Sequence, residues 1–81
     1  MRVRVRLFAR LRDIVGAAEL ERDIPEGMPL RAVWQALIAE FPALERYTPT
    51  ISGAVNGEYA RLDARVQDGD EVAFLPPVSG G

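Results

Sequence analysis

The chain has 81 residues, and a chain of this length forms one domain because its core is too small to divide. Hydrophobic residues make up 48% of it, which is typical of a globular protein and argues against disorder. Cysteine and histidine are absent, which excludes disulfides, thiolate chemistry and the commonest general base. The net charge of −2 argues against general nucleic-acid binding, and the apolar runs are far shorter than a membrane span of about 20 residues.

The first residues lead directly into a strand pattern without an apolar signal region, so we expect a cytoplasmic location. Residues 2–8 alternate strictly, and this period of two predicts a half-buried strand. One side of it is apolar and the other begins with three arginines: Val3, Val5 and Leu7 against Arg2, Arg4, Arg6 and Phe8. Residues 10–16 predict a short turn or a single helical turn ending at Gly16. Residues 18–24, with Leu20 and Ile24 at even spacing, fit a second strand antiparallel to the first.

The segment from residue 29 to residue 41 carries the clearest helical pattern. Its apolar residues recur at intervals of three and four and define one helix face: Leu30, Val33, Trp34, Leu37, Ile38 and Phe41. Pro29 suits the first turn of a helix, and Pro42 ends the helix directly after Phe41. We interpret Trp34 and Phe41 as core residues.

The second half of the chain is predicted to contain three strands, at residues 51–55, 58–60 and 71–75. Asn56-Gly57 favours a tight hairpin turn between the first two, since both positions tolerate positive φ. A second turn is predicted at Asp68-Gly69, and Pro76-Pro77 ends the last strand.

The predicted fold class is therefore α+β, a mixed sheet of about five strands with one main helix packed on one face. A hairpin, a crossover helix and a final strand paired with the first make the ubiquitin-like β-grasp plan. We expect a β-grasp domain at residues 1–75 and a flexible tail at residues 76–81.

Two charged groups invite a functional interpretation. Asp68, Asp70 and Glu71 lie within four residues, but a calcium loop spreads its oxygens over about twelve, so a charged turn is the better interpretation. The three arginines of the first strand are few for a nucleic-acid binding site, because such binding requires several phosphates to be neutralised by basic side chains. They predict a solvated face or a patch for an acidic protein partner.

The C-terminal segment has the features of a reactive tail. Pro76-Pro77 favours extended polyproline geometry, and six extended residues reach roughly 20 Å beyond the last strand. Because glycine has no Cβ, the Gly80-Gly81 end can enter a channel too narrow for other side chains. We expect the Gly81 carboxylate to be delivered into the active site of another protein. A frayed terminus with a chance Gly-Gly is the alternative.

These residues resemble the small subunit of molybdopterin synthase, the sulfur carrier of molybdenum cofactor synthesis. The resemblance covers essentially the whole chain and is carried by residues 7–12 with Gly16, by residues 54–59 and above all by residues 68–81. It implies that an E1-like adenylating enzyme uses ATP and magnesium to activate the Gly81 carboxylate. A sulfur donor then converts the acyl-adenylate to a thiocarboxylate.

The resemblance further implies that the chain docks on the large subunit of molybdopterin synthase, in an expected heterotetramer of two small and two large subunits. The terminal sulfur passes to a cyclic pyranopterin monophosphate, and two transfers build the molybdopterin dithiolene. On this view the chain binds no cofactor or metal itself and is a co-substrate subunit, not an enzyme on its own. Three alternatives stay open: a sulfur carrier for thiamine or tRNA thiolation, a ubiquitin-like modifier of lysines, and a structural module that does not use its terminus.

Strand parity also predicts a docking surface. Val72 and Phe74 would point to the helix, which leaves Ala73 and Leu75 on the open face. Phe8 and Leu75 would then be neighbours at the base of the tail, with Tyr59 extending the same surface. The predicted partner-binding residues are Phe8, Tyr59, Leu75, Pro76, Pro77, Val78 and Ser79, with Gly80 and Gly81 as the reacting end.

All ten basic residues are arginine. A GC-rich genome or a thermophilic host explains such a bias. A functional explanation is that a chain without lysine limits self-ligation while its carboxylate is activated.

Overall fold

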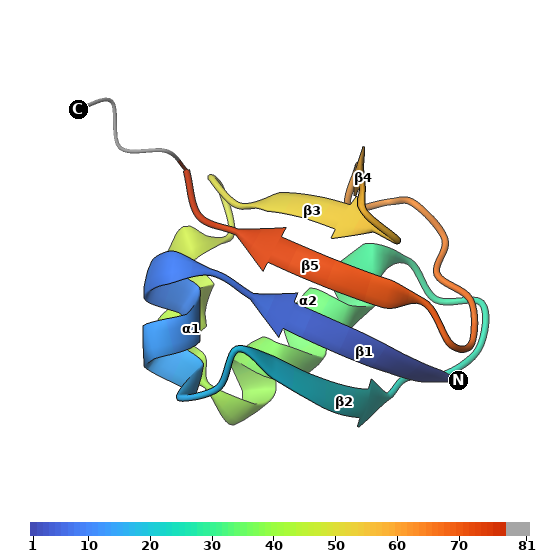
Figure 1. Cartoon of the computed structure of the whole chain (residues 1–81), viewed down its shortest axis with the longest axis horizontal. Helices are drawn as coiled ribbons and strands as arrows, with labels where there is room; N and C mark the ends of the chain where they lie inside the picture. The colour runs from blue at the N-terminus through green and yellow to red at the C-terminus, as the bar shows by residue number, and fades with distance from the viewer. Residues whose placement is uncertain (78–81) are drawn as a thin grey trace.

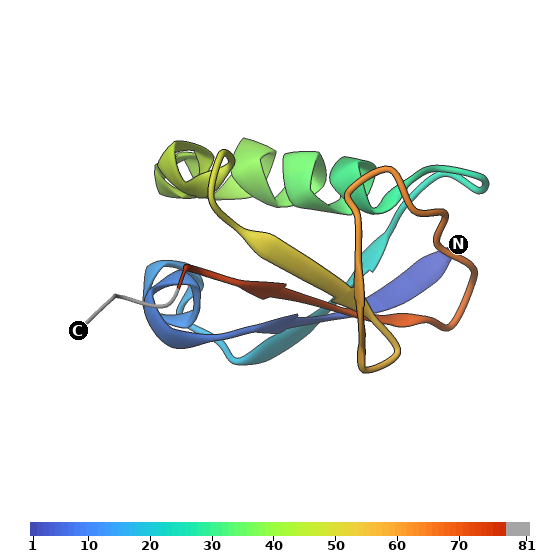
Figure 2. The same cartoon turned by 90° about the horizontal axis from the view of Figure 1, so that it is seen from above.

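The computed structural model describes residues 1–77, which form a five-stranded mixed sheet crossed on one face by one long helix (Figures 1 and 2). The elements in chain order are β1 (Arg2–Leu7), α1 (Ala9–Val15), β2 (Glu19–Asp23), α2 (Leu30–Glu40), the 3-10 helix η1 (Pro42–Tyr47), β3 (Ser52–Val55), β4 (Glu58–Ala60) and β5 (Glu71–Leu75). The strand order is β2-β1-β5-β3-β4, with β1 and β5 parallel and the other pairs antiparallel. The predicted mixed sheet with a helix on one face is confirmed.

The core lies between α2 and one face of the sheet. Side chains at alternate positions of the two central strands are at most 2% exposed: Val3, Val5 and Leu7 from β1, and Val72 and Phe74 from β5. The buried face of α2 meets them, and the Trp34 and Phe74 rings lie 5.0 Å apart. Trp34 is therefore the core residue that the helical pattern predicted, whereas Phe41 is only half-buried at the margin of the same core.

Residues 9–15 form a seven-residue helix, which is longer than the short turn or single helical turn predicted for residues 10–16, whereas the predicted end at Gly16 is confirmed. Leu11 is fully buried, and Ile14 and Val15 pack against the core from the same helix. This burial stabilises a helix too short to persist by itself. Gly16 ends it at a φ of +83°, and its N–H donates to the carbonyl of Arg12.

The chain after α2 also differs from the simple connector expected. Pro42 ends α2 but begins η1, where a proline costs no helical hydrogen bond. Leu44 on η1 is fully buried. The Asn56-Gly57 turn is confirmed, with φ values of +50° and +84°. Among residues 1–77, no helix combines the length and hydrophobicity that crossing a membrane requires.

Candidate functional site

The face of the sheet opposite α2 carries a row of paired positions across four strands. Arg6 of β1 lies opposite Ala73 of β5, Ala73 opposite Ala54 of β3, and Ala54 opposite Tyr59 of β4. Cross-strand neighbours share one face of a sheet, so this register groups their side chains on the open face. Small alanines occupy the middle of the row, and larger side chains flank it.

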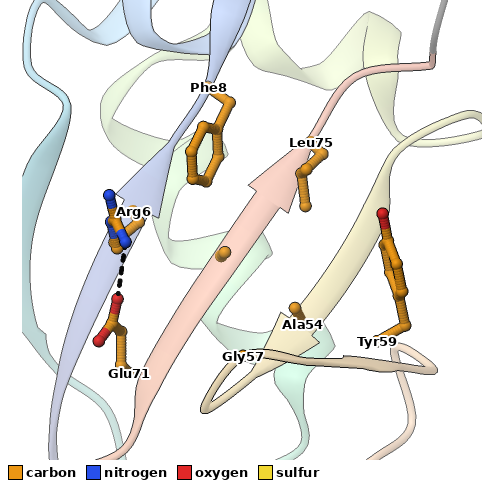
Figure 3. Close-up of a pocket in the computed structure, with 8 residues that line it drawn as sticks. Arg6, Phe8, Ala54, Gly57, Tyr59, Glu71 and Leu75 are labelled. Carbon is orange, nitrogen blue, oxygen red and sulfur yellow. Dashed lines mark hydrogen bonds and ion pairs between the residues drawn. The ribbon is translucent and has the colours of Figure 1, made fainter.

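This arrangement produces a shallow depression of about 240 Å³, which we call the apolar pocket (Figure 3). Its lining residues come from all four strands of the row and from the chain following β1: Arg6, Phe8, Ala54, Gly57, Tyr59, Glu71, Ala73 and Leu75. Tyr59 is 81% exposed, the highest value among the exposed large hydrophobic side chains of the described chain. The structure thus brings Phe8, Tyr59 and Leu75 together as strand parity predicted.

Phe8 reaches the open face because its backbone stays extended after β1, with φ −124° and ψ 152°. The strand alternation therefore continues for one more residue before α1 begins. The Arg6 guanidinium lies over the Phe8 ring, with its central carbon 5.3 Å from the ring centroid, in a cation–π contact. The same guanidinium approaches Glu71, with 3.4 Å between Nη1 and Oε1. Phe8 is half-buried in this position.

Leu75 ends β5 and lies opposite Ser52 of β3. Leu75 and Pro76 are half-buried and Pro77 is exposed, so the C-terminal segment begins directly at the rim of the apolar pocket. Pro76 and Pro77 are not among the residues that line it. The other predicted tail residues, Val78, Ser79, Gly80 and Gly81, lie outside the described residues.

The part of the open face formed by β1 and β2 is charged, and its basic and acidic side chains form ion pairs with one another. Each arginine of β1 has an acidic partner on a neighbouring strand: Arg2 with Glu21 and Asp23 at 3.6 Å each, Arg4 with Glu19 at 3.0 Å, and Arg6 with Glu71 at 3.4 Å. These pairs favour the solvated face over the patch for an acidic partner, the two alternatives that the sequence left open. The sequence signal for these partners was the spacing of two between Glu19, Glu21 and Asp23, which places all three on one side of β2.

The acidic turn before β5 is a structural element. Asp68 Oδ1 accepts a hydrogen bond from the N–H of Arg2 at 2.6 Å. Asp70 accepts one from the N–H of Gln67 at 2.8 Å and one from Nδ2 of Asn56 at 3.0 Å. These bonds fix the approach to β5 and tie it to the Asn56-Gly57 turn. Within residues 1–77, no three acidic side chains are grouped as metal ligands would be.

The fold and the site define a ubiquitin-like β-grasp protein whose open sheet face carries an apolar pocket at the start of its C-terminal segment. The chain belongs to the ThiS family, whose model matches residues 5–81.

Named relatives narrow this class. The molybdopterin synthase sulfur carrier subunit of Escherichia coli is 38% identical over 81 residues, covering 98% of this chain and 99% of the relative. The crystal structure of SAMP1 from Haloferax volcanii superposes with a TM-score of 0.88 at 32% identity, covering 100% of both chains. A chain in the complex of subunits 1 and 2 of the molybdopterin-converting factor from Helicobacter pylori matches with a TM-score of 0.68 at 26% identity, again over 100% of both chains.

Proposed function

We propose that this chain is the sulfur carrier subunit of a molybdopterin synthase. The observation that carries the proposal is the apolar pocket at the base of a C-terminal segment ending in Gly80-Gly81. A surface of this kind suits docking, because apolar side chains grouped on an open sheet face mark a site for a protein partner. The similarity to relatives named molybdopterin synthase sulfur carrier subunit and to a chain of a molybdopterin-converting factor complex supports the assignment to this pathway.

The chemistry of the proposal begins at the Gly81 carboxylate. A terminal carboxylate has a pKa of about 3.5, so it is ionised at neutral pH and is a poor electrophile. A partner adenylating enzyme, which binds the ATP and magnesium, lets this carboxylate attack the α-phosphorus of ATP and release pyrophosphate. A sulfur donor then delivers hydrosulfide to the acyl carbon: the C–S bond forms, the C–O bond to phosphate breaks, AMP leaves with a proton released to water, and a thiocarboxylate remains.

The second stage takes place on the large subunit, in the cytoplasm. The chain docks through the apolar pocket and inserts residues 76–81, and the thiocarboxylate sulfur passes to cyclic pyranopterin monophosphate. Two such transfers build the dithiolene. The chain supplies the sulfur and the docking surface, while the acids, bases and bound cofactors belong to its partners.

Removal of Gly81 tests the proposal directly. We expect this deletion to abolish adenylation, thiocarboxylate formation and sulfur transfer, with the free energy of unfolding changed by less than about 0.5 kcal/mol because the terminal residue lies beyond β5. The matched control is Arg31→Gln, an exposed position on α2, on the opposite side of the sheet from the apolar pocket, which leaves the C-terminal segment intact. Intact-mass measurement of the chain from its native host reports the exchange of oxygen for sulfur. Full cofactor synthesis by the Gly81-deleted chain would overturn the assignment.

A ubiquitin-like protein modifier is the second candidate, favoured by the likeness to SAMP1 of Haloferax volcanii, a small archaeal modifier protein. Both functions use an activated Gly81, but a modifier forms an amide with a lysine of a target protein. Tryptic digestion of host proteins separates the two functions, because cleavage after Arg65, the last basic residue of the chain, would leave residues 66–81 as a remnant on each modified lysine. Remnants that disappear with the gene for this chain would assign it a modifier activity.

A further inference from the structure

Tyr59 and the apolar pocket lie side by side on the open face of the sheet. Tyr59 is 81% exposed, so its ring projects from β4 with little support from its own chain. The pocket beside it is a depression of about 240 Å³, with the small side chains of Ala54 and Ala73 in the middle (Figure 3). One face therefore carries both a projecting aromatic side chain and a recess with room for a single aromatic side chain.

We propose that two copies of this chain associate face to face, with Tyr59 of each copy inserted into the apolar pocket of the other. Such a contact is isologous, because each copy gives one ring and receives one, and it closes at two copies. The inference goes beyond the proposed function and does not depend on it, since the described face contains both halves of the contact.

The strand register permits a twofold axis that makes both insertions at once. Tyr59 lies opposite Ala54 of β3, and Ala54 lies opposite Ala73 of β5, so neighbouring positions are one strand apart, or about 4.8 Å. An axis between the two faces that runs along β3 over Ala54 places Tyr59 of each copy over Ala73 of the other. The two Ala54 side chains then face each other on the axis, where their small size lets the sheets approach closely.

The lining of the pocket suits a tyrosine from a second copy. Phe8 and Leu75 offer apolar contacts to the ring. A tyrosine hydroxyl needs a hydrogen-bond partner when it is covered, and Arg6 and Glu71 at the β1 side of the pocket offer a donor and an acceptor. The ion pairs between β1 and β2 lie outside the overlap of the two β5–β3–β4 halves, so docking leaves their charges in water.

The contact is small, which limits its strength. An aromatic side chain buries about 150–250 Å², so two rings and the pocket surfaces that receive them bury about 600–1,000 Å² in total. Stable interfaces bury at least about 1,200 Å², so we expect a weak and reversible dimer with a Kd of roughly 0.1 mM. A dimer of this strength covers the docking surface only until a tighter-binding partner replaces the second copy.

The test measures self-association of the full chain by analytical ultracentrifugation, from about 10 μM to about 1 mM, on both sides of the expected Kd. Tyr59→Ser removes the inserted ring, and Tyr59→Phe removes only its hydroxyl. Ala73→Leu fills the recess and leaves Tyr59 in place. Met28→Ala is the matched control, because Met28 is the other exposed large hydrophobic side chain within residues 1–77 and does not line the pocket. Circular dichroism verifies the fold of each variant, and Tyr59→Ser decides alone if Ala73→Leu unfolds.

We expect wild type and Met28→Ala to dimerise equally, whereas Tyr59→Ser and Ala73→Leu should each raise the Kd at least about 10-fold. Tyr59→Phe should raise it less than about 5-fold, because the ring still fills the recess. Dilution should shift the NMR signals of the Ala54 and Ala73 methyl groups in wild type and leave that of Met28 unchanged. A wild-type chain that is monomeric at about 1 mM, or a Tyr59→Ser chain that dimerises like wild type, would overturn the proposal. A failure of the proposed function would show in the Gly81 deletion and not in this measurement.

Discussion

The two faces of β5 have different surroundings, although the residues of both faces alternate along one short strand. Val72 and Phe74 are fully buried against α2. Ala73 and Leu75, their direct neighbours, lie half-buried on the open face, where they line the apolar pocket. Nothing in residue type separates the two pairs, since all four are apolar. The difference is the side of the strand, so one face contributes to stability and the other is available for recognition.

The open face of the sheet is also divided into two parts that differ in chemistry. Its β1–β2 half consists of ion pairs between exposed side chains, such as Arg4–Glu19 at 3.0 Å, and exposed pairs of this kind contribute little to stability. Its β5–β3–β4 half is apolar and has no covering layer among the described residues. The charged half satisfies its own charges, and the apolar half gains by burying its surface against a partner.

The largest expected effect lies on the covered face. Phe74→Ala should reduce the free energy of unfolding by about 3–5 kcal/mol, because it removes a fully buried ring and its contact with Trp34. Urea denaturation followed by Trp34 fluorescence measures the loss. Affinity of the remaining folded fraction for the large subunit should change little. A loss below about 1 kcal/mol would mean that the core tolerates the cavity. The covered face of β5 would then not be the face that stabilises the fold.

Substitutions on the open face are expected to change the affinity for a partner and not the free energy of unfolding. Phe8→Ala and Leu75→Ala should each weaken binding to the proposed large-subunit partner by about 1–3 kcal/mol, because a few residues in well-packed, desolvated pockets account for most of the binding energy of an interface. Isothermal titration calorimetry measures the change, and urea denaturation verifies that the fold is retained. Arg4→Gln, on the charged half of the same face, is the matched control and should leave affinity nearly unchanged. Unfolding by either alanine variant with unaltered affinity of the folded fraction would place these residues in the core.

Strand alternation made the division between the faces predictable. In β1 the period of two identified Val3, Val5 and Leu7 as the covered side, and burial follows that period without any knowledge of register. The same parity, together with pairing of the first and last strands, placed Phe8 beside Leu75. The helix α2 was equally clear, because eleven residues carry several turns of the apolar pattern.

The features that were missed depend on contacts distant in sequence. A seven-residue helix such as α1 shows too little periodicity to distinguish it from a turn, and its stability comes from burying Leu11. The charge pairs of the open face require the register between β1 and β2, in which Arg4 lies opposite Glu21. The spacing of two fixes the side of these carboxylates, but a shift of two residues would keep that side and change every partner, so the sequence pattern does not fix the register by itself. Ala54 and Gly57 were likewise absent from the predicted site, because they join it only across strands.

The smallest expected effect concerns the one ion pair that ties β2 to α2. Arg22 donates to Glu40 from Nε and Nη2, at 2.6 and 2.7 Å, in a two-pronged geometry. The hydrogen bond from Arg22 holds the pKa of the Glu40 carboxyl below its ordinary value of 4.5. Both side chains keep about a third or more of their surface exposed, so screening by water limits the gain to about 0.5–1 kcal/mol. Glu40→Gln should therefore lower the free energy of unfolding by that amount at neutral pH.

The pH dependence of this loss distinguishes the ion pair from a simple change in packing. Because the pKa of Glu40 is lower in the folded chain, its contribution is fully present above the ordinary value of 4.5 and disappears as the pH falls through the lowered folded value. The hydrogen bond to Glu40 raises the pKa of Arg22 above its ordinary value, so the charge of Arg22 is constant over the whole acidic and neutral range. Urea denaturation of wild type and Glu40→Gln should therefore give curves that differ at pH 7 and converge in acid. Glu19→Gln, which removes the single-contact pair with Arg4 on the open face, should show a smaller difference at pH 7. A Glu40→Gln difference that stays constant from pH 7 into acid would assign the effect to packing of the side chain and not to its charge.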